Sequence, residues 1–183
     1  YQTSDTSPAE IIDLMVGRGV AEFYAERKPE IGEELFRVEN LSRWGFFHDV
    51  SFSVRAGETL AICGLAGAGR TELARAIVGI DGYDEGKLVL EGKPVTFQNM
   101  FEAIQKGVVY LTESRKTDGL AVRLTVGENT LAASIPDYTK GGFYKPSAAA
   151  DKVTDLINTL SIYPPEPARP VTNLSGGNQQ KVL

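Results

Sequence analysis

The sequence predicts an α/β fold in which a sheet with antiparallel additions packs against helices. Short β-like runs recur from Leu35 onward. Between residues 59 and 77, a continuous apolar run, a glycine-rich turn and a helical segment follow one another directly. Residues 153–160 repeat apolar side chains at helical spacing. The succession of strand, glycine-rich turn and helix decides the class, because it is the building unit of α/β proteins.

Two kinds of strand are expected. Alternating or hairpin-forming runs occupy residues 35–38, 50–54 and 87–97, the last with a turn at 92–93 at the periphery of the sheet. The runs TLAIC (residues 59–63) and VVYL (residues 108–111) are continuously apolar, so we expect them to be strands buried within the sheet. The single cysteine, Cys63, lies in the first of these runs and is expected to be a buried thiol.

Three helices are expected in addition to the one that follows the glycine-rich turn. Ser7, Pro8 and Glu10 form an N-terminal capping pattern that predicts a helix over residues 8–16, followed by a linker. Ser147 is expected to cap a helix whose buried face carries Val153, Leu156, Ile157 and Leu160. The last helix is expected to begin directly after Leu174.

Composition indicates an ordinary globular chain. Its 183 residues can bury a sizeable core, and 42% are hydrophobic and 23% charged. The net charge is −5 and the basic residues are scattered, so neither a nucleic acid nor an anionic membrane surface is expected as a partner. No apolar stretch approaches the roughly 18 residues that a membrane span requires.

The first chemically informative segment is GLAGAGRT, residues 64–71. It has the spacing of a phosphate-binding loop between a strand and a helix, with Arg70 where lysine is expected. Backbone N–H groups of such a loop can surround a phosphate, and the Thr71 hydroxyl can bind Mg²⁺. A strand-to-helix turn that merely requires glycine remains the alternative. The residues expected at a nucleotide are Gly64, Gly67, Ala68, Gly69, Arg70, Thr71 and Glu72.

The second informative segment is LSGGNQQK, residues 174–181. Ser175 is a good helix cap, and the following glycines expose backbone N–H groups where the helix starts. Taken alone, an ordinary capped helix would explain it equally well.

Together the two segments resemble the ATP-binding subunits of ABC-type importers for monosaccharides of the ribose, galactose and arabinose type. LSGGNQQKV is similar to the signature sequence of that family, with the residues Leu174, Ser175, Gly176, Gly177, Asn178 and Gln179. GLAGAGRTELARAIVG resembles the phosphate loop of the second of two fused cassettes, in which arginine in place of lysine is the usual form. In YLTESRKTDGL, Glu113 stands where most cassettes carry a glutamine that contacts Mg²⁺ and the transporter, and TVGENTLAASI resembles the helical subdomain.

The resemblance implies an incomplete P-loop NTPase of the ABC ATPase type, with an antiparallel β subdomain and the start of the helical subdomain. Residues 1–34 would be the end of a preceding cassette and a linker, and residues 35–183 a partial nucleotide-binding domain. Trp44 is similar to the aromatic residue that stacks on adenine, although a structural aromatic residue is the alternative. His48 precedes the phosphate loop and is expected at the surface or a strand edge.

The resemblance further implies ATP and Mg²⁺ as ligands, and three partners: the first nucleotide-binding half, membrane permease subunits and, indirectly, a sugar-binding protein. The subunit would lie at the cytoplasmic face of the plasma membrane. Because the family's later catalytic elements follow the signature helix, the isolated chain ending at Leu183 is expected to be inactive as an ATP hydrolase. Arg70 and Glu113 leave open a second function, a non-hydrolysing half that serves dimerisation and docking.

Overall fold

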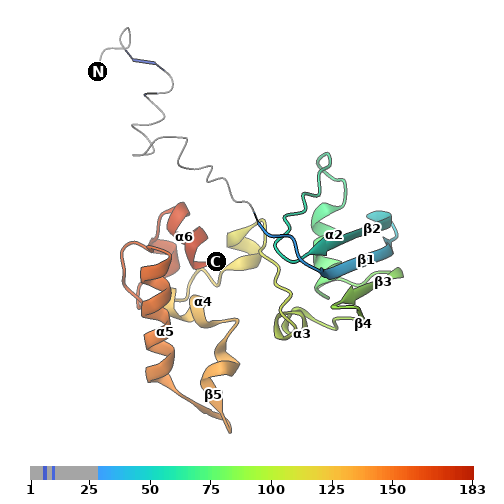
Figure 1. The fold of residues 1–183 in the computed structure, drawn as a ribbon. Helices are drawn as coiled ribbons and strands as arrows, with labels where there is room; N and C mark the ends of the chain where they lie inside the picture. The colour runs from blue at the N-terminus through green and yellow to red at the C-terminus, as the bar shows by residue number, and fades with distance from the viewer. Residues whose placement is uncertain (1–5, 8–9, 11–28) are drawn as a thin grey trace.

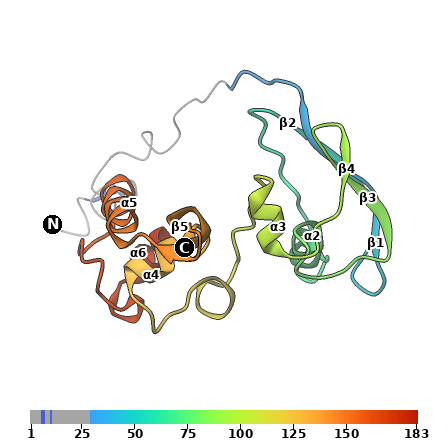
Figure 2. The ribbon, with the colours of Figure 1, turned by 90° about the horizontal axis from the view of Figure 1, so that it is seen from below.

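The computed structural model describes residues 6–7, 10 and 29–183, which form two lobes (Figures 1 and 2). The sheet lobe contains the four-stranded sheet and helices α2 and α3. The helical lobe contains α4, α5, α6 and a small β5–β6 hairpin. In both views the two groups of elements lie on opposite sides of the connecting segment that follows α3. Each lobe has its own cluster of buried apolar side chains.

The sheet lobe is built on an antiparallel sheet with the strand order β2-β1-β3-β4. Its strands are β1 Glu34–Arg43, β2 Phe47–Arg55, β3 Glu85–Leu90 and β4 Lys93–Val95. Val38 in β1 pairs with Phe52 on one side and with Leu88 on the other. Strands near residues 35–38 and 50–54 and the peripheral hairpin at 87–97 are therefore confirmed. His48 is exposed on the edge strand β2, as expected.

Helices α2 (Arg70–Ile77) and α3 (Met100–Gln105) pack against this sheet. Leu73 and Val78, from α2 and its end, and Ala103 from α3 are buried in one cluster with Val38, Leu41 and Leu88 of the sheet. Asn99 caps α3 by accepting the Glu102 N–H at 3.0 Å. The sheet thus buries one apolar face against the helix that follows the glycine-rich loop.

The prediction of buried strands at residues 59–63 and 108–111 is wrong. Both segments are irregular and largely exposed, Val109 to 70%, and Cys63 is exposed rather than buried. A strand buried on both faces requires neighbouring strands that satisfy its backbone N–H and C=O groups. Among the described residues, no strand pairs with either segment, so their apolar sequences remain without the partners that would make them strands.

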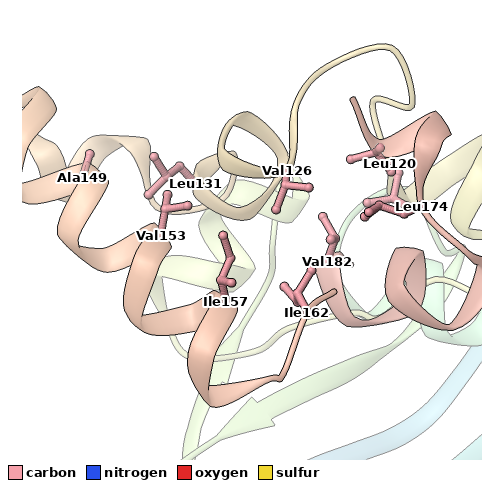
Figure 3. Close-up of a cluster of buried hydrophobic side chains, with 10 residues drawn as sticks. Leu120, Val126, Leu131, Ala149, Val153, Ile157, Ile162, Leu174 and Val182 are labelled. Carbon is pink, nitrogen blue, oxygen red and sulfur yellow. The ribbon is translucent and has the colours of Figure 1, made fainter. Parts of the chain in front are cut away.

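The helical lobe has its own apolar core (Figure 3). Its elements are η3 Arg115–Gly119 (a π-helical turn), α4 Val126–Leu131, η4 Ile135–Tyr138, β5 Thr139–Lys140, β6 Phe143–Tyr144, α5 Pro146–Thr159, η5 Val171–Asn173 and α6 Gly176–Val182. Val126 of α4, Val153 and Ile157 of α5 and Val182 of α6 point toward one another in this core. A full capping box of Thr125 and Glu128 begins α4.

The start and the buried face of α5 differ from expectation. The helix begins at Pro146, with Lys145 as the capping residue and no side-chain hydrogen bond, so Ser147 lies inside the first turn. Proline takes the first helical position because it lacks the N–H that would be unsatisfied there. Val153 and Ile157 are buried as expected, whereas Leu160 is exposed.

At the N-terminus, the described residues include both partners of the expected capping pattern. The Ser7 N–H donates to Glu10 Oε2 at 2.8 Å, and the Glu10 N–H donates to Ser7 Oγ at 3.2 Å. The rest of the helix expected at residues 8–16, and most of the linker, lie outside the described residues. The domain boundary at residue 34 remains a prediction. Within the described part of the chain, no helix combines the length and the apolar character needed to cross a membrane.

Candidate functional site

The glycine-rich loop of residues 64–69 leads into the first turn of α2. Gly67 and Gly69 have φ angles of 81° and 79°, a left-handed conformation that favours glycine. The Ala68 N–H donates to the Leu65 carbonyl at 3.1 Å and closes a turn within the loop. The loop is exposed except at Gly69. Because the first amides of a helix have no acceptor within it, this helix start presents unpaired N–H groups.

Gly69 brings the loop against the turn between β1 and β2. A side chain at Gly69 would collide with the Phe46 carbonyl, so only glycine fits this contact. Trp44 belongs to the same turn, is 56% exposed, and lies with its ring centroid 5.6 Å from that of His48. The backbone N–H of Trp44 donates to Asp84 Oδ2 at 2.7 Å, which fixes the backbone of the turn. An exposed aromatic ring therefore lies in the turn that contacts the end of the glycine-rich loop.

An ion-pair cluster holds the far end of α2 to the sheet. Asp81 accepts from Arg75 Nε at 2.9 Å and from Arg43 Nη1 at 2.8 Å. These interactions, with the Arg75 hydrogen bond the largest cause, lower the pKa of Asp81 below its ordinary value. The same pairing raises the pKa of Arg75. The cluster was not anticipated from the sequence, because nothing in the spacing of these residues indicates that they meet.

The loop helix and the segment around Glu113 also meet. The Thr71 hydroxyl donates to Glu113 Oε2 at 3.4 Å, and both side chains are exposed. A hydroxyl and a carboxylate are the oxygen ligands that Mg²⁺ prefers, and Mg²⁺ usually takes only one or two protein ligands beside phosphates. Among the described residues, no group of three or more His, Cys, Asp or Glu is placed to hold a metal by itself. The residues present therefore fit Mg²⁺.

The Arg70 side chain folds back toward the start of the loop. A side chain at Gly64 would lie 3.7 Å from Arg70 Cδ, which places the arginine stem over the first glycine. The guanidinium carries its positive charge at the loop, where the expected lysine would be a compact point charge.

The second motif caps α6. Ser175 Oγ accepts the Asn178 N–H at 3.4 Å and the Asn178 Nδ2 at 3.1 Å, which confirms a capped helix directly after Leu174. Gln179 is buried, with Nε2 donating to the carbonyls of Val171 and Leu174. Leu174 is also buried, whereas Gly177 is exposed at the helix start.

The structure groups the expected site residues into two sets. Thr71 of the loop helix contacts Glu113, and Gly69 lies against the turn that contains Trp44, whereas residues 174–179 lie at the start of α6 in the helical lobe (Figure 1). No hydrogen bond or ion pair joins the glycine-rich loop to residues 174–179 in the part of the chain that the structure describes.

Comparison with known proteins identifies the chain. The ABC transporter family profile matches residues 47–183. The chain belongs to the ABC transporter family. The ribose import ATP-binding protein RbsA of Oceanobacillus iheyensis is 44% identical over 179 residues, which cover 98% of this chain and 36% of that protein. RbsA of Bacillus subtilis is 40% identical over 180 residues, with coverages of 98% and 36%. The chain thus spans about a third of the length of these ABC relatives.

Solved structures confirm the expected ABC ATPase fold. An ATP-binding cassette of an ABC transporter in its ADP conformation matches with a TM-score of 0.64 and 26% identity, covering 81% of this chain and 62% of that chain. A nucleotide-free ATP-binding cassette matches with a TM-score of 0.62 and 25% identity, covering 81% and 65%. The fold is an incomplete ABC domain with an antiparallel sheet and the start of the helical subdomain.

Arg115, close to Glu113 in the sequence, was not predicted to have a role. The segment that follows Glu113 contains a π-helical turn at Arg115–Gly119, and Arg115 is half-buried with Nε donating to Gln179 Oε1 at 3.3 Å. The residues lie 64 positions apart, so no local pattern could have paired them.

Proposed function

We propose that this chain is part of the ATP-binding subunit of a sugar importer of the ribose type, and that it contributes parts of two different nucleotide sites. The contact that carries the proposal is the one between the Thr71 hydroxyl and the Glu113 carboxylate, at 3.4 Å. It joins a phosphate-loop helix to the segment that supplies a second oxygen ligand. The names of the relatives, which are ribose import ATP-binding proteins, support the class of substrate.

In this proposal the residues of the loop bind the phosphates of ATP. The unpaired N–H groups at the start of α2 and the dipole of this helix favour negative charge there. Thr71 and Glu113 hold Mg²⁺, which neutralises phosphate charge when it is bound. Trp44 stacks on the adenine, since it lies in the turn against Gly69.

Arg70 makes this loop a weak site for hydrolysis. Its planar, forked guanidinium replaces the compact ammonium that usually reaches the terminal phosphates, and its stem lies over Gly64. Binding through backbone amides can persist with arginine, whereas the charge geometry for phosphoryl transfer is altered. The same observation favours the second candidate function, a half that binds nucleotide without hydrolysing it and serves dimerisation and docking.

The signature motif serves the other site. Because residues 174–179 lie in a different lobe from the loop, they are free to face the nucleotide of another half, in a head-to-tail pair of cassettes. The partners are then the first nucleotide-binding half, permease subunits and, through these, a sugar-binding protein. The subunit would lie peripherally on the cytoplasmic face of the membrane.

The test compares two substitutions in the intact transporter. Ser175→Arg places bulk and charge at the helix start and should abolish ATP hydrolysis and sugar uptake. Arg70→Ala should reduce both by less than about tenfold, because its loop does not carry the hydrolytic step. Thr172→Arg is the matched control, since it adds the same side chain at a nearby exposed position and should behave like the wild type. Equal losses for Ser175→Arg and Arg70→Ala would overturn the division of roles.

A further inference from the structure

Asn178 binds two different parts of the helical lobe through the two ends of its side-chain amide. Its Oδ1 accepts the backbone N–H of Tyr163 at 2.9 Å, in the turn that follows α5. Its Nδ2 donates to Ser175 Oγ at 3.1 Å, at the start of α6. Because a backbone N–H can only donate, the contact with Tyr163 settles which end of the amide is the oxygen. The amide donor of Asn178 is therefore directed at the Ser175 hydroxyl.

Asn178 leaves the Ser175 hydroxyl with one way to form a further hydrogen bond. Ser175 Oγ accepts the backbone N–H of Asn178 at 3.4 Å as well as the side-chain Nδ2 at 3.1 Å. A hydroxyl has two acceptor lone pairs and one O–H, so two donors at the oxygen occupy its acceptor capacity. Among the described residues the Ser175 O–H donates to no acceptor, and Ser175 is exposed. The proton is therefore left for an acceptor that comes from outside this chain.

The turn that Asn178 contacts is held against α6 at a second point. Lys181 Nζ donates to the Ser161 carbonyl at 2.6 Å. Asn178 and Lys181 are three positions apart on the helix and so lie on the same face. Between their two acceptor and donor groups in the turn, Ile162 is buried in the core of the lobe. The Asn178 amide thus rests on a fixed turn and cannot rotate away from Ser175 without losing the bond to Tyr163.

We propose that Asn178 is a positioning residue that makes the Ser175 hydroxyl an obligate donor toward an anionic acceptor. The inference rests on the proposed function, in which Ser175 faces the phosphates of a nucleotide bound by the other half. A phosphate oxygen accepts hydrogen bonds, so a serine whose lone pairs are already occupied presents to it the one group that it can bind. The hydroxyl is then oriented before the two halves meet, and no free rotation has to be arrested when they close.

The test compares Asn178→Asp with Asn178→Ala in the intact transporter. Aspartate keeps the shape of the side chain and an acceptor for the Tyr163 N–H, but it replaces the amide donor with a second acceptor. The Ser175 O–H then donates to this carboxylate, whereas in Asn178→Ala it is free to turn toward phosphate. Asn178→Asp should therefore lose at least about tenfold in kcat for ATP hydrolysis, and Asn178→Ala about threefold. KM for ATP should stay within about twofold for both, because ATP is first bound by the loop of the other half.

The rank order of the variants separates positioning from support of the fold. Asn178→Asp retains the bond to Tyr163 and should melt at or above Asn178→Ala, so a residue that only supported the fold would rank the two activities the other way. Asn173→Asp is the matched control, since it makes the same change at an exposed position two residues before Ser175 and should hydrolyse ATP like the wild type. Asn178→Gln keeps an amide donor and should retain more activity than either variant at this position.

Two serine substitutions distinguish failure of this role from failure of the proposed function. If Ser175→Arg hydrolyses ATP like the wild type, the proposed function fails and the positioning role with it. If Ser175→Arg is inactive but Ser175→Ala retains full activity, or if Asn178→Asp equals or exceeds Asn178→Ala, the positioning role is overturned while the function stands. Should Asn178→Asp melt well below Asn178→Ala, the comparison rests on Asn178→Gln, for which a kcat no higher than that of Asn178→Ala overturns the role.

Discussion

The contact between the glycine-rich loop and the β1–β2 turn predicts that two similar glycines differ sharply in their tolerance of a side chain. Gly67 and Gly69 have nearly the same left-handed φ, 81° and 79°. A Cβ at Gly67 would meet nothing within 4 Å, whereas one at Gly69 would collide with the Phe46 carbonyl oxygen and lie 3.1 Å from its carbon. The pair therefore separates the cost of the backbone conformation from the cost of the contact.

The expected magnitudes follow from these two costs. An alanine in the left-handed region costs about 1 kcal/mol, so Gly67→Ala should lower the free energy of unfolding by about that amount. Gly69→Ala bears the same conformational cost and adds overpacking against a backbone carbonyl, which costs about 2 kcal/mol more. Gly69→Ala should therefore be less stable than Gly67→Ala by about 2 kcal/mol.

Urea unfolding followed by the fluorescence of Trp44 measures this difference. Trp44 is the only tryptophan of the chain and lies in the turn that contacts Gly69. Gly67→Ala serves as the matched control, because it differs from Gly69→Ala only in the missing contact. Equal stabilities, within about 0.5 kcal/mol, would refute the close approach of the loop to Phe46.

Two further predictions concern the sheet lobe and the helical lobe. Because Arg75 and Arg43 lower the pKa of Asp81, its contribution to stability is present above the ordinary pKa of a carboxyl, near 4, and is lost as the pH falls through the lowered value. Asp81→Asn should therefore cost about 1 kcal/mol at pH 7 and progressively less below pH 4, and urea midpoints that differ equally at both pH values would contradict this. Val153→Ala should cost about 2 kcal/mol in thermal unfolding because Val153 is 3% exposed, whereas the same change at Val109, which is 70% exposed, should cost almost nothing. Equal losses would show that Val153 does not lie in a packed core.

Local signals explain most of what the sequence predicts correctly. The capped start of α6 at Ser175 and the helix after the glycine-rich loop depend on residues three or four positions apart, and the structure confirms both. The strands at residues 35–38 and 50–54 were also predictable, because alternation of apolar and polar residues at 50–54 indicates one buried face.

Contacts that depend on distant partners explain the errors. The runs at residues 59–63 and 108–111 have the composition of buried strands, but composition cannot supply the neighbouring strands that would pair with them. The meeting of Thr71 with Glu113 spans 42 positions and that of Arg115 with Gln179 spans 64, and neither follows from spacing. The family resemblance predicts a functional role for Glu113 but none for Arg115.

The separation of the two apolar clusters has a consequence for how the chain is made. Residues of the sheet-side cluster lie between Phe36 and Tyr110, and those of the helical cluster lie between Leu120 and Leu183. Each core is therefore encoded by one uninterrupted stretch of sequence. Since chains fold from the N-terminus as they leave the ribosome, the sheet-side core can begin to close before the helical residues have emerged. A substitution in the helical core should then leave the closure of the sheet-side core in the nascent chain unchanged.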